Sequence, residues 1–254
     1  MLIDTHAHLD LPQFDPDRDE MINRASNENI VIIHSGLGIE GIGKAKELVK
    51  NYDNIYATLG LSPTEFSGEV ICGTINEIRK NKDNPKIIGI GEVGLDYHWV
   101  KERELRNAEH ENFKKFIELS SETKLPLVIH SRNAENDCVK ILKEYDRGAI
   151  MHCFCGTIEL ALEAISFGCL ISVTTTFMNS GYRKKMVQEL PLEKLVLETD
   201  APYLSPVQGK RNESINIKLT AGEIARIKGV DFTTVAETTT RNAEKFFNVK
   251  FDTI

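Results

Sequence analysis

Leu2-Ile3-Asp4-Thr5-His6-Ala7-His8 is the first predicted strand of the chain, and it ends in a loop at Leu9-Asp10. Side chains on a strand alternate between its two faces, so His6 and His8 project from the same face. Two imidazoles placed in this way can bind one metal ion. Taken alone, a His-x-His pair is more often a pair of core or surface histidines, so the rest of the chain has to decide between the two interpretations.

Predicted helices and strands alternate along the whole sequence. The later strands are short apolar runs rich in β-branched residues, which are typical of buried parallel strands; they span residues 30–33, 55–60, 87–92, 125–130, 149–153, 170–173 and 195–200. The predicted helices span residues 17–29, 41–52, 69–82, 101–123, 134–145, 157–167, 182–190, 218–228 and 233–247. Eight strand–helix units predict an α/β fold of the TIM (β/α)8 barrel type, with residues 1–254 forming a single domain.

Composition narrows the classes of function. The chain has 254 residues, a usual length for such a barrel, and 41% of them are hydrophobic and 27% charged. Five cysteines are an odd number, which favours reduced thiols, and a strand beginning at Leu2 leaves no room before it for a secretion signal. We therefore expect a cytoplasmic protein that uses neither a membrane nor an obligate protein partner. The net charge of −7 gives no global basic surface for DNA, so a local cation site must hold any anionic substrate.

Ligand-type side chains stand at the ends of five predicted strands: His6, His8, Glu92, His130, His152 and Asp200. Barrel enzymes carry their sites at the carboxyl ends of the strands, and buried groups of these types cost free energy unless they are paired or bound to metal. Nitrogen and oxygen donors favour Zn, Mn, Fe, Co or Ni, or else Mg. Six ligands exceed the three that hold a single catalytic zinc and can serve two divalent ions bridged by a carboxylate.

Five short motifs carry a resemblance to a known family. They are Thr5-His6-Ala7-His8-Leu9-Asp10, Gly91-Glu92-Val93-Gly94-Leu95-Asp96-Tyr97, Leu127-Val128-Ile129-His130-Ser131-Arg132-Asn133-Ala134, His152-Cys153-Phe154-Cys155-Gly156 and Glu198-Thr199-Asp200-Ala201-Pro202-Tyr203-Leu204. In this order, and spread over nearly the whole chain, they resemble the successive motifs of the TatD family. The resemblance implies a metal-dependent hydrolase of the amidohydrolase superfamily that acts on phosphodiesters, commonly DNA.

The resemblance also implies roles for the six ligands. His6, His8 and Asp200 would hold one metal ion, with Glu92 as a bridge. The second ion would be held by three residues: Glu92, His130 and His152. Glu92 and Asp200 are the predicted catalytic residues, and Asp200 is the candidate to accept a proton from the attacking water and pass it to the leaving oxygen.

The sequence departs from the family pattern on the predicted substrate side. Gly60-Leu61-Ser62-Pro63 has Ser62 where the family usually has a histidine, and the segment 206–214 is shorter than usual. Arg132 follows His130 by two residues and can either bind a phosphate bidentately or pair with a nearby carboxylate. Lys210 and Arg211 can bind backbone phosphates or be simply solvated. We therefore expect substrate contacts from four residues, Ser62, Arg132, Lys210 and Arg211.

The leading functional hypothesis is a TatD-type deoxyribonuclease that removes nucleotides from an end of single-stranded DNA. Its partner would be a nucleic acid or a small phosphodiester. A second hypothesis is hydrolysis of another ester or amide, such as a D-aminoacyl-tRNA. Glu92 argues against membership of the lactonase and phosphotriesterase barrels, which this chain also resembles but which use a carboxylated lysine on strand four. A third hypothesis is a non-catalytic barrel that keeps a metal for stability, and the complete set of six ligands argues against it.

Overall fold

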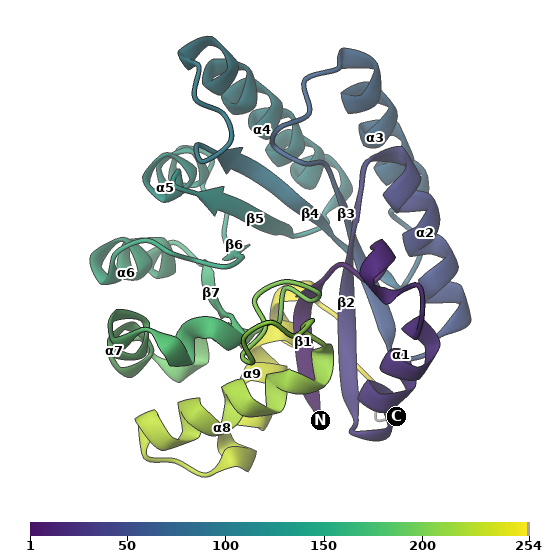
Figure 1. Cartoon of the computed structure of the whole chain (residues 1–254). Coiled ribbons are helices and arrows are strands. Elements are labelled where there is room, and N and C mark those ends of the chain that lie inside the picture. Colours follow the sequence, from purple (N-terminus) through teal and green to yellow (C-terminus); the bar gives the residue numbers. More distant parts are fainter. Residues whose placement is uncertain (253–254) are drawn as a thin grey trace.

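The computed structural model describes residues 1–252 and shows strands and helices alternating along the chain (Figure 1). The strands are β1 (Leu2–Ala7), β2 (Ile30–Leu37), β3 (Ile55–Gly60), β4 (Ile87–Asp96), β5 (Leu127–Arg132), β6 (Ala149–Met151), β7 (Leu170–Val173) and β8 (Leu195–Leu197). The α-helices are α1 (Arg18–Asn27), α2 (Gly38–Asn51), α3 (Gly68–Asn81), α4 (Arg103–Thr123), α5 (Glu135–Glu144), α6 (Ile158–Ser166), α7 (Gly181–Glu189), α8 (Ile217–Lys228) and α9 (Phe232–Phe247).

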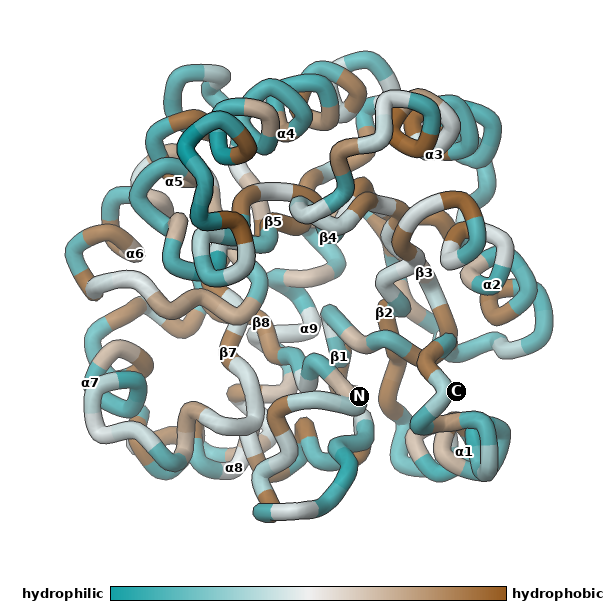
Figure 2. Tube along the Cα trace, turned by 45° about the horizontal axis from the view of Figure 1, so that its top comes forward, coloured by the Kyte–Doolittle hydropathy of each residue, from teal (hydrophilic) through white to brown (hydrophobic). Residues whose placement is uncertain are grey.

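The eight strands form one parallel sheet in the order β1 to β8, so each strand pairs with the next one in the chain. A parallel bridge between Ala7 and Ala201 joins the two ends of the sheet. Two backbone hydrogen bonds support it, because the His8 amide donates to the Ala201 carbonyl at 2.7 Å and the Asp200 amide donates to the His6 carbonyl at 2.9 Å. The helices lie outside the strands (Figures 1 and 2). This arrangement confirms the predicted TIM barrel.

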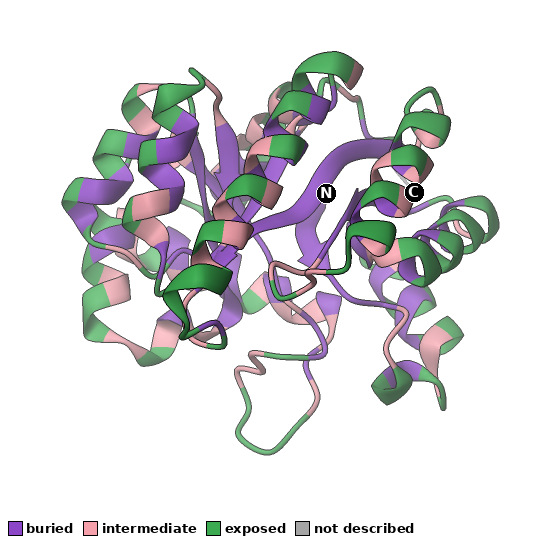
Figure 3. Ribbon diagram, turned by 90° about the horizontal axis from the view of Figure 1, so that it is seen from above, coloured by how far each residue is buried: buried purple, intermediate pink, exposed green. Residues whose placement is uncertain are grey.

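The core has two layers, one on each side of the barrel wall. The inner cluster contains at least one side chain from every strand and is closed by α9 and the segment after it; among its members are Ile3, Val31, Tyr56, Ile88, Val128, Ile150, Leu170, Val196 and Phe247. The larger outer cluster lies between the strands and the helices. The strands are accordingly buried almost throughout, whereas each helix alternates buried and exposed residues along its length (Figure 3).

Six strands end at residues other than those predicted; β2 continues to Leu37 instead of residue 33, and β1 ends at Ala7 instead of His8. β4 continues to Asp96, so Glu92 lies inside the strand rather than at its end, and β5 continues to Arg132. β8 ends at Leu197 instead of Asp200, and β6 ends at Met151 instead of Cys153. Backbone conformation explains the early ends of β6 and β8, because Cys153 has φ +45° and Asp200 has φ +57°, and both values lie in the left-handed region, outside the range of β-strands.

The structure also bears on the expected compartment. All five cysteines are free, and two of them, Cys138 and Cys169, are buried. Within residues 1–252, no helix combines the length and the apolar character needed to span a bilayer. The cytoplasmic location itself stays a prediction.

Candidate metal centre

Glu92 lies at the centre of a cluster that gathers all six predicted ligands. Its carboxylate faces four imidazoles. Oε2 lies 3.3 Å from Nδ1 of His130, 3.4 Å from Nε2 of His152 and 3.6 Å from Nε2 of His6. Oε1 lies 3.9 Å from Nε2 of His8. Glu92 is only 8% exposed, so the structure brings a buried carboxylate and four histidines from β1, β5 and the segments after β1 and β6 into contact.

The backbone of β4 is fixed tightly around Glu92. The Glu92 amide donates to the Ser35 hydroxyl at 3.0 Å, and the Leu61 amide donates to the Glu92 carbonyl at 3.0 Å. Gly60 permits this approach, because a Cβ at that position would lie 2.3 Å from the Glu92 carbonyl oxygen. The pairing of β4 with β5 shifts register between Ile90 and Val93, on either side of Glu92. This irregularity turns the Glu92 side chain toward the cluster from within the strand.

Asp200 completes the cluster from the segment after β8. Its Oδ1 lies 3.5 Å from Nε2 of His8, 3.9 Å from Nε2 of His6 and 4.0 Å from Nε2 of His152. The backbone bond from the Asp200 amide to the His6 carbonyl holds this carboxylate beside β1. The Asp200 side chain is 14% exposed, compared with 10% for His8 and 1% for His6, so it is the most exposed ligand-type group on this side.

Two further carboxylates hold histidines of the cluster from behind, and the sequence analysis gave them no role. Asp96 Oδ2 lies 2.9 Å from Nε2 of His130, and Glu198 Oε2 lies 2.9 Å from Nδ1 of His152. Each pair fixes its imidazole ring and leaves the other ring nitrogen facing Glu92. Asp96 and Glu198 both stand inside the motifs quoted above. Their spacing from the ligands on neighbouring strands is the sequence signal that could have identified these two carboxylates.

The same region closes the barrel through buried polar contacts. The Asp4 carboxylate accepts from the Thr199 amide at 2.8 Å and from the Thr199 hydroxyl at 2.6 Å, which ties β1 to the segment after β8. Burial raises the pKa of Asp4 to about 7. Glu198 Oε1 accepts from the Cys153 amide at 2.7 Å and so fixes the turn that carries His152. The ligand-bearing segments are therefore held by groups other than the ligands themselves.

The electrostatics of the cluster favour an anionic Glu92 among histidines. Burial opposes ionisation, yet the surrounding imidazoles, His130 foremost, hold the pKa of Glu92 well below its usual range. Burial also opposes charge on His152, but Glu198 and Glu92 raise the pKa of His152 to about 10. In the same way, Glu92 and Asp96 raise the pKa of His130 to about 9 against the effect of burial. For His6, burial and the nearby His152 lower the pKa well below its usual value.

The donor set fits divalent metal ions. Three groups of ligand atoms lie within 4.8 Å of one another: His6, His8 and Glu92; His6, His152 and Asp200; and Glu92, His130 and His152. His6 Nε2 and His8 Nε2 point at each other across 3.2 Å. His130 and His152 have the carboxylate-backed geometry that fixes the tautomer and direction of metal-binding imidazoles. The residues present can therefore hold metal through nitrogen and oxygen donors.

The predicted substrate-side residues have different surroundings. Arg132 is exposed, with its guanidinium 5.9 Å from the Trp99 ring centre. Ser62 is half-buried and lies 2.9 Å from the Thr64 hydroxyl. Lys210 is exposed. The predicted substrate contacts of all three stay predictions.

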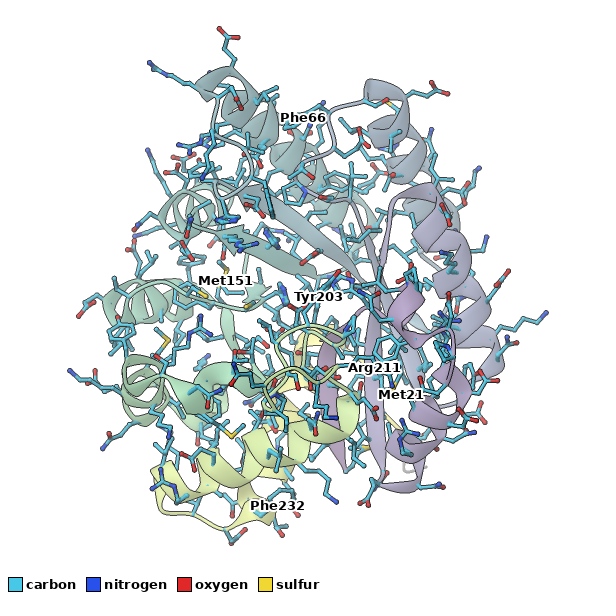
Figure 4. All side chains as sticks on the ribbon, viewed as in Figure 1. Met21, Phe66, Met151, Tyr203, Arg211 and Phe232 are labelled. Atoms are coloured by element: carbon cyan, nitrogen blue, oxygen red, sulfur yellow. The ribbon has the colours of Figure 1, made fainter. Side chains whose placement is uncertain are left out.

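Arg211 is already engaged within the protein. It lies on the loop after β8 (Figure 4) and forms ion pairs of 2.5 Å with Asp17 and 2.9 Å with Glu213. It also donates to the Gln13 carbonyl at 2.7 Å and covers the Phe14 ring at 4.6 Å. These contacts attach the loop to the segment before α1. The predicted phosphate contact of Arg211 also stays a prediction, and the structure gives this side chain a structural role.

An eight-stranded β/α barrel that gathers histidine and carboxylate ligands at the carboxyl end of its sheet is the architecture of metal-dependent hydrolases. The profile of one such family, described as TatD related DNase, matches residues 3–248. The chain therefore belongs to the TatD family, as its motifs predicted.

Full-length relatives agree with this assignment. The metal-dependent hydrolase YabD of Bacillus subtilis is 38% identical over 98% of this chain and 100% of its own length. The metal-dependent hydrolase MJ1582 of Methanocaldococcus jannaschii is 41% identical over 96% of each protein. Deoxyribonuclease TATDN3 of Homo sapiens is 32% identical over 97% of this chain and 94% of that protein. The crystal structure of YJJV, a TatD homologue from Escherichia coli, has a TM-score of 0.88 and 25% identity over 98% of both chains. The protein is a metal-dependent hydrolase.

Proposed function

We propose that this hydrolase cleaves phosphodiester bonds and is a TatD-type deoxyribonuclease that removes nucleotides from an end of single-stranded DNA. The observation that carries the proposal is the position of Glu92, a buried carboxylate with four imidazoles 3.3–3.9 Å from its oxygens. A donor set of this kind can hold divalent cations, which would place positive charge where a phosphodiester carries negative charge. The name of the human relative, deoxyribonuclease TATDN3, supports the choice of DNA.

We propose further that two divalent ions are bound. The clusters His6–His8–Glu92 and Glu92–His130–His152 share only Glu92, which would bridge the two positions. Divalent ions in such a site activate a water molecule and polarise the phosphoryl group. The donors fit Zn, Mn, Fe, Co or Ni, and also Mg, without distinguishing among them.

The protein's own groups would then orient the reactants and move the proton. Asp200 faces His6 and His8 from the exposed side of the cluster, where it can accept the proton of the attacking water and later donate it to the leaving oxygen. Asp96 and Glu198 would keep His130 and His152 in the orientation that the site requires. Glu92 would stay ionised throughout, since its neighbours lower its pKa.

The proposal is tested with protein reconstituted separately with each candidate metal. Labelled single-stranded and duplex DNA are assayed beside methyl p-nitrophenyl phosphate, an aryl carboxylic ester and a D-aminoacyl-tRNA. We expect hydrolysis of the phosphodiesters, shortening of single-stranded DNA from an end, and loss of both after chelation. Hydrolysis confined to the carboxylic ester or the aminoacyl-tRNA would replace this proposal with the second hypothesis.

A further inference from the structure

Trp99 is an exposed aromatic residue beside the metal centre. It is the only tryptophan in the chain and stands in the turn that follows β4. The side chain is 67% exposed, the highest value among the exposed large hydrophobic residues of the described part of the chain. Its ring meets the His98 ring edge-on, with 4.8 Å between the centroids. An indole so exposed gains little from packing within its own turn.

The turn that carries Trp99 is nevertheless fixed, and it is fixed by a group of the centre itself. Asp96 Oδ1 accepts from the His98 amide at 2.9 Å and from the Trp99 amide at 3.0 Å. The other oxygen of the same carboxylate holds His130. Val100 anchors the far side of the turn, because it is buried and its amide donates to the Asp96 carbonyl at 3.0 Å. The Asp96 carboxylate therefore holds both the backbone that carries Trp99 and the His130 ring.

Tyr97, in the same turn, is also held by several contacts. The Tyr97 hydroxyl donates to Asp137 at 2.5 Å and lies 2.6 Å from Nε2 of His110. The Arg106 guanidinium covers the Tyr97 ring at 4.2 Å and donates to the Val100 carbonyl at 3.0 Å. These contacts engage both the hydroxyl and the ring of Tyr97, so Trp99 is the more exposed aromatic side chain of the turn.

Arg132 supplies a cation next to this surface. It pairs in register with Asp96 across β4 and β5, which places it beside the turn, and its guanidinium lies 5.9 Å from the Trp99 ring centre. The side chain is exposed, and no carboxylate within residues 1–252 lies within 4.0 Å of its guanidinium nitrogens. The alternative that Arg132 serves to neutralise a nearby carboxylate therefore has no support in its surroundings.

We propose that Trp99 and Arg132 form a nucleotide-binding subsite. The Trp99 indole stacks on one base of the substrate strand, while Arg132 binds an adjacent phosphate. Aromatic stacking is available to every base but requires an exposed base face, which a duplex conceals and a single strand offers. The subsite would thus select single strands and hold the scissile phosphodiester over the centre. The inference rests on the proposed function.

The test removes the indole and the base in turn. Trp99→Ala and Trp99→Phe are compared with wild type on a short single-stranded DNA and on the same strand with one abasic nucleotide, moved through the positions near the cleaved end. We expect Trp99→Ala to lower kcat/KM on the intact strand by roughly 5- to 150-fold, the range measured for single stacked bases. At one abasic position the loss should nearly disappear, and Trp99→Phe should restore most of the activity.

The same protein gives a direct binding signal. Because Trp99 is the only tryptophan, intrinsic indole fluorescence reports on it alone, and titration with a phosphorothioate oligothymidylate should quench it. Arg132→Ala should reduce the slope of log Kd for this oligonucleotide against log salt by about 0.7, the value for one phosphate contact on a single strand. Two variants serve as controls. Phe232→Ala removes an exposed aromatic at the start of α9, far from the loop after β8 in Figure 4, and Lys185→Ala removes an exposed cation on α7.

The outcomes separate this inference from the proposed function. Equal losses for Trp99→Ala on intact and abasic strands, or an unquenched indole at saturating oligonucleotide, would overturn the stacking role and leave the phosphodiesterase activity standing. If wild-type protein hydrolyses neither DNA nor methyl p-nitrophenyl phosphate with any metal, the proposed function fails and this inference fails with it. A loss for Phe232→Ala equal to that for Trp99→Ala also counts against the subsite.

Discussion

Asp200 combines two properties that a proton acceptor requires. It faces His6 and His8 at 3.9 and 3.5 Å, and it is the more exposed group on its side of the cluster. The variant Asp200→Asn keeps the shape and one acceptor oxygen but cannot take up a proton. We expect kcat to fall by about 10²- to 10⁴-fold, the usual contribution of general acid–base catalysis.

Loss of metal is the competing explanation for such a fall, because Asp200 is also a predicted ligand. Metal content must therefore be measured on the same Asp200→Asn sample, in excess metal. A variant that keeps its metal and turns over at the wild-type rate would remove Asp200 from the proton-transfer step.

Asp96 acts through His130 and not on the substrate. In Asp96→Asn the side-chain oxygen that caps the turn at His98 and Trp99 is retained, while the charge beside Nε2 of His130 is lost. We expect metal affinity or activity to fall by about 10- to 100-fold, as is usual for carboxylates behind metal-binding histidines. Competition with a chromophoric chelator measures the metal affinity. Unchanged affinity together with unchanged kcat would show that this pair has only a local structural role.

At the scale of elements, His34 connects β2 to the loop after His8. Its Nδ1 accepts from the Leu9 amide at 3.2 Å, and burial lowers its pKa to about 3. The charged groups around it are His8, Arg18 and Lys44, with the Asp10 carboxylate 4.0 Å from its Nε2.

The low pKa of His34 makes stability depend on pH. An unfolded histidine titrates near 6.5, so the stabilisation from neutral His34 is fully present above pH 6.5 and is lost as the pH falls toward 3. His34→Asn keeps an acceptor for the Leu9 amide but does not titrate. Between pH 7 and 5, wild type should therefore lose about 2 kcal/mol of unfolding free energy relative to the variant. Urea denaturation of both proteins with chelator present measures this, and parallel pH profiles would contradict it.

Arg211 and Lys210 are adjacent in sequence but differ in surroundings. Arg211→Ala removes the contacts to Asp17, Glu213 and the Gln13 carbonyl, so we expect a loss of about 1 kcal/mol and a Tm lower by roughly 2–4 °C. Lys210→Ala should leave Tm unchanged and, if Lys210 binds a phosphate, reduce the slope of log Kd for single-stranded DNA against log salt by about 0.7. If instead Arg211→Ala reduces the salt dependence of DNA binding and leaves Tm unchanged, Arg211 is the substrate-binding residue.

Patterns within single segments predicted the elements well. Alternation of β-branched runs with amphipathic stretches gave all eight strands, and β3 and β7 have the predicted bounds. The ends of β6 and β8 were wrong because turns at Cys153 and Asp200 depend on contacts from other strands, such as Glu198 to the Cys153 amide. A local pattern carries no information about such contacts.

The same limit applies to the site. Ligand-type residues at the carboxyl ends of parallel strands must meet at one end of a barrel, so Glu92 and the five ligand-type residues around it could be predicted together. Asp96 and Glu198 could not be assigned, because their roles depend on which ring nitrogen of His130 and His152 faces the centre. Arg211 resembled a phosphate-binding residue in sequence, and only the fold brings Asp17 to it.

At the scale of the whole molecule, metal binding should stabilise the fold as well as support activity. The ligands come from β1, β4 and β5 and from the segments after β1, β6 and β8, so an ion that binds them joins both ends of the sheet. A ligand that binds only the folded state at 100 times its Kd adds about 2.7 kcal/mol. For a chain of this size that corresponds to a rise in Tm of roughly 5–10 °C.

Calorimetry of the protein before and after dialysis against chelator measures this difference, and readdition of the metal should restore the higher Tm. A variant that lacks the bridging carboxylate, Glu92→Gln, serves as the comparison, because it should lose most of the metal-dependent rise. Chelation must also abolish hydrolysis of small phosphodiesters. A chelated protein with full activity and an unchanged Tm would mean that the cluster around Glu92 holds no metal that matters to this enzyme.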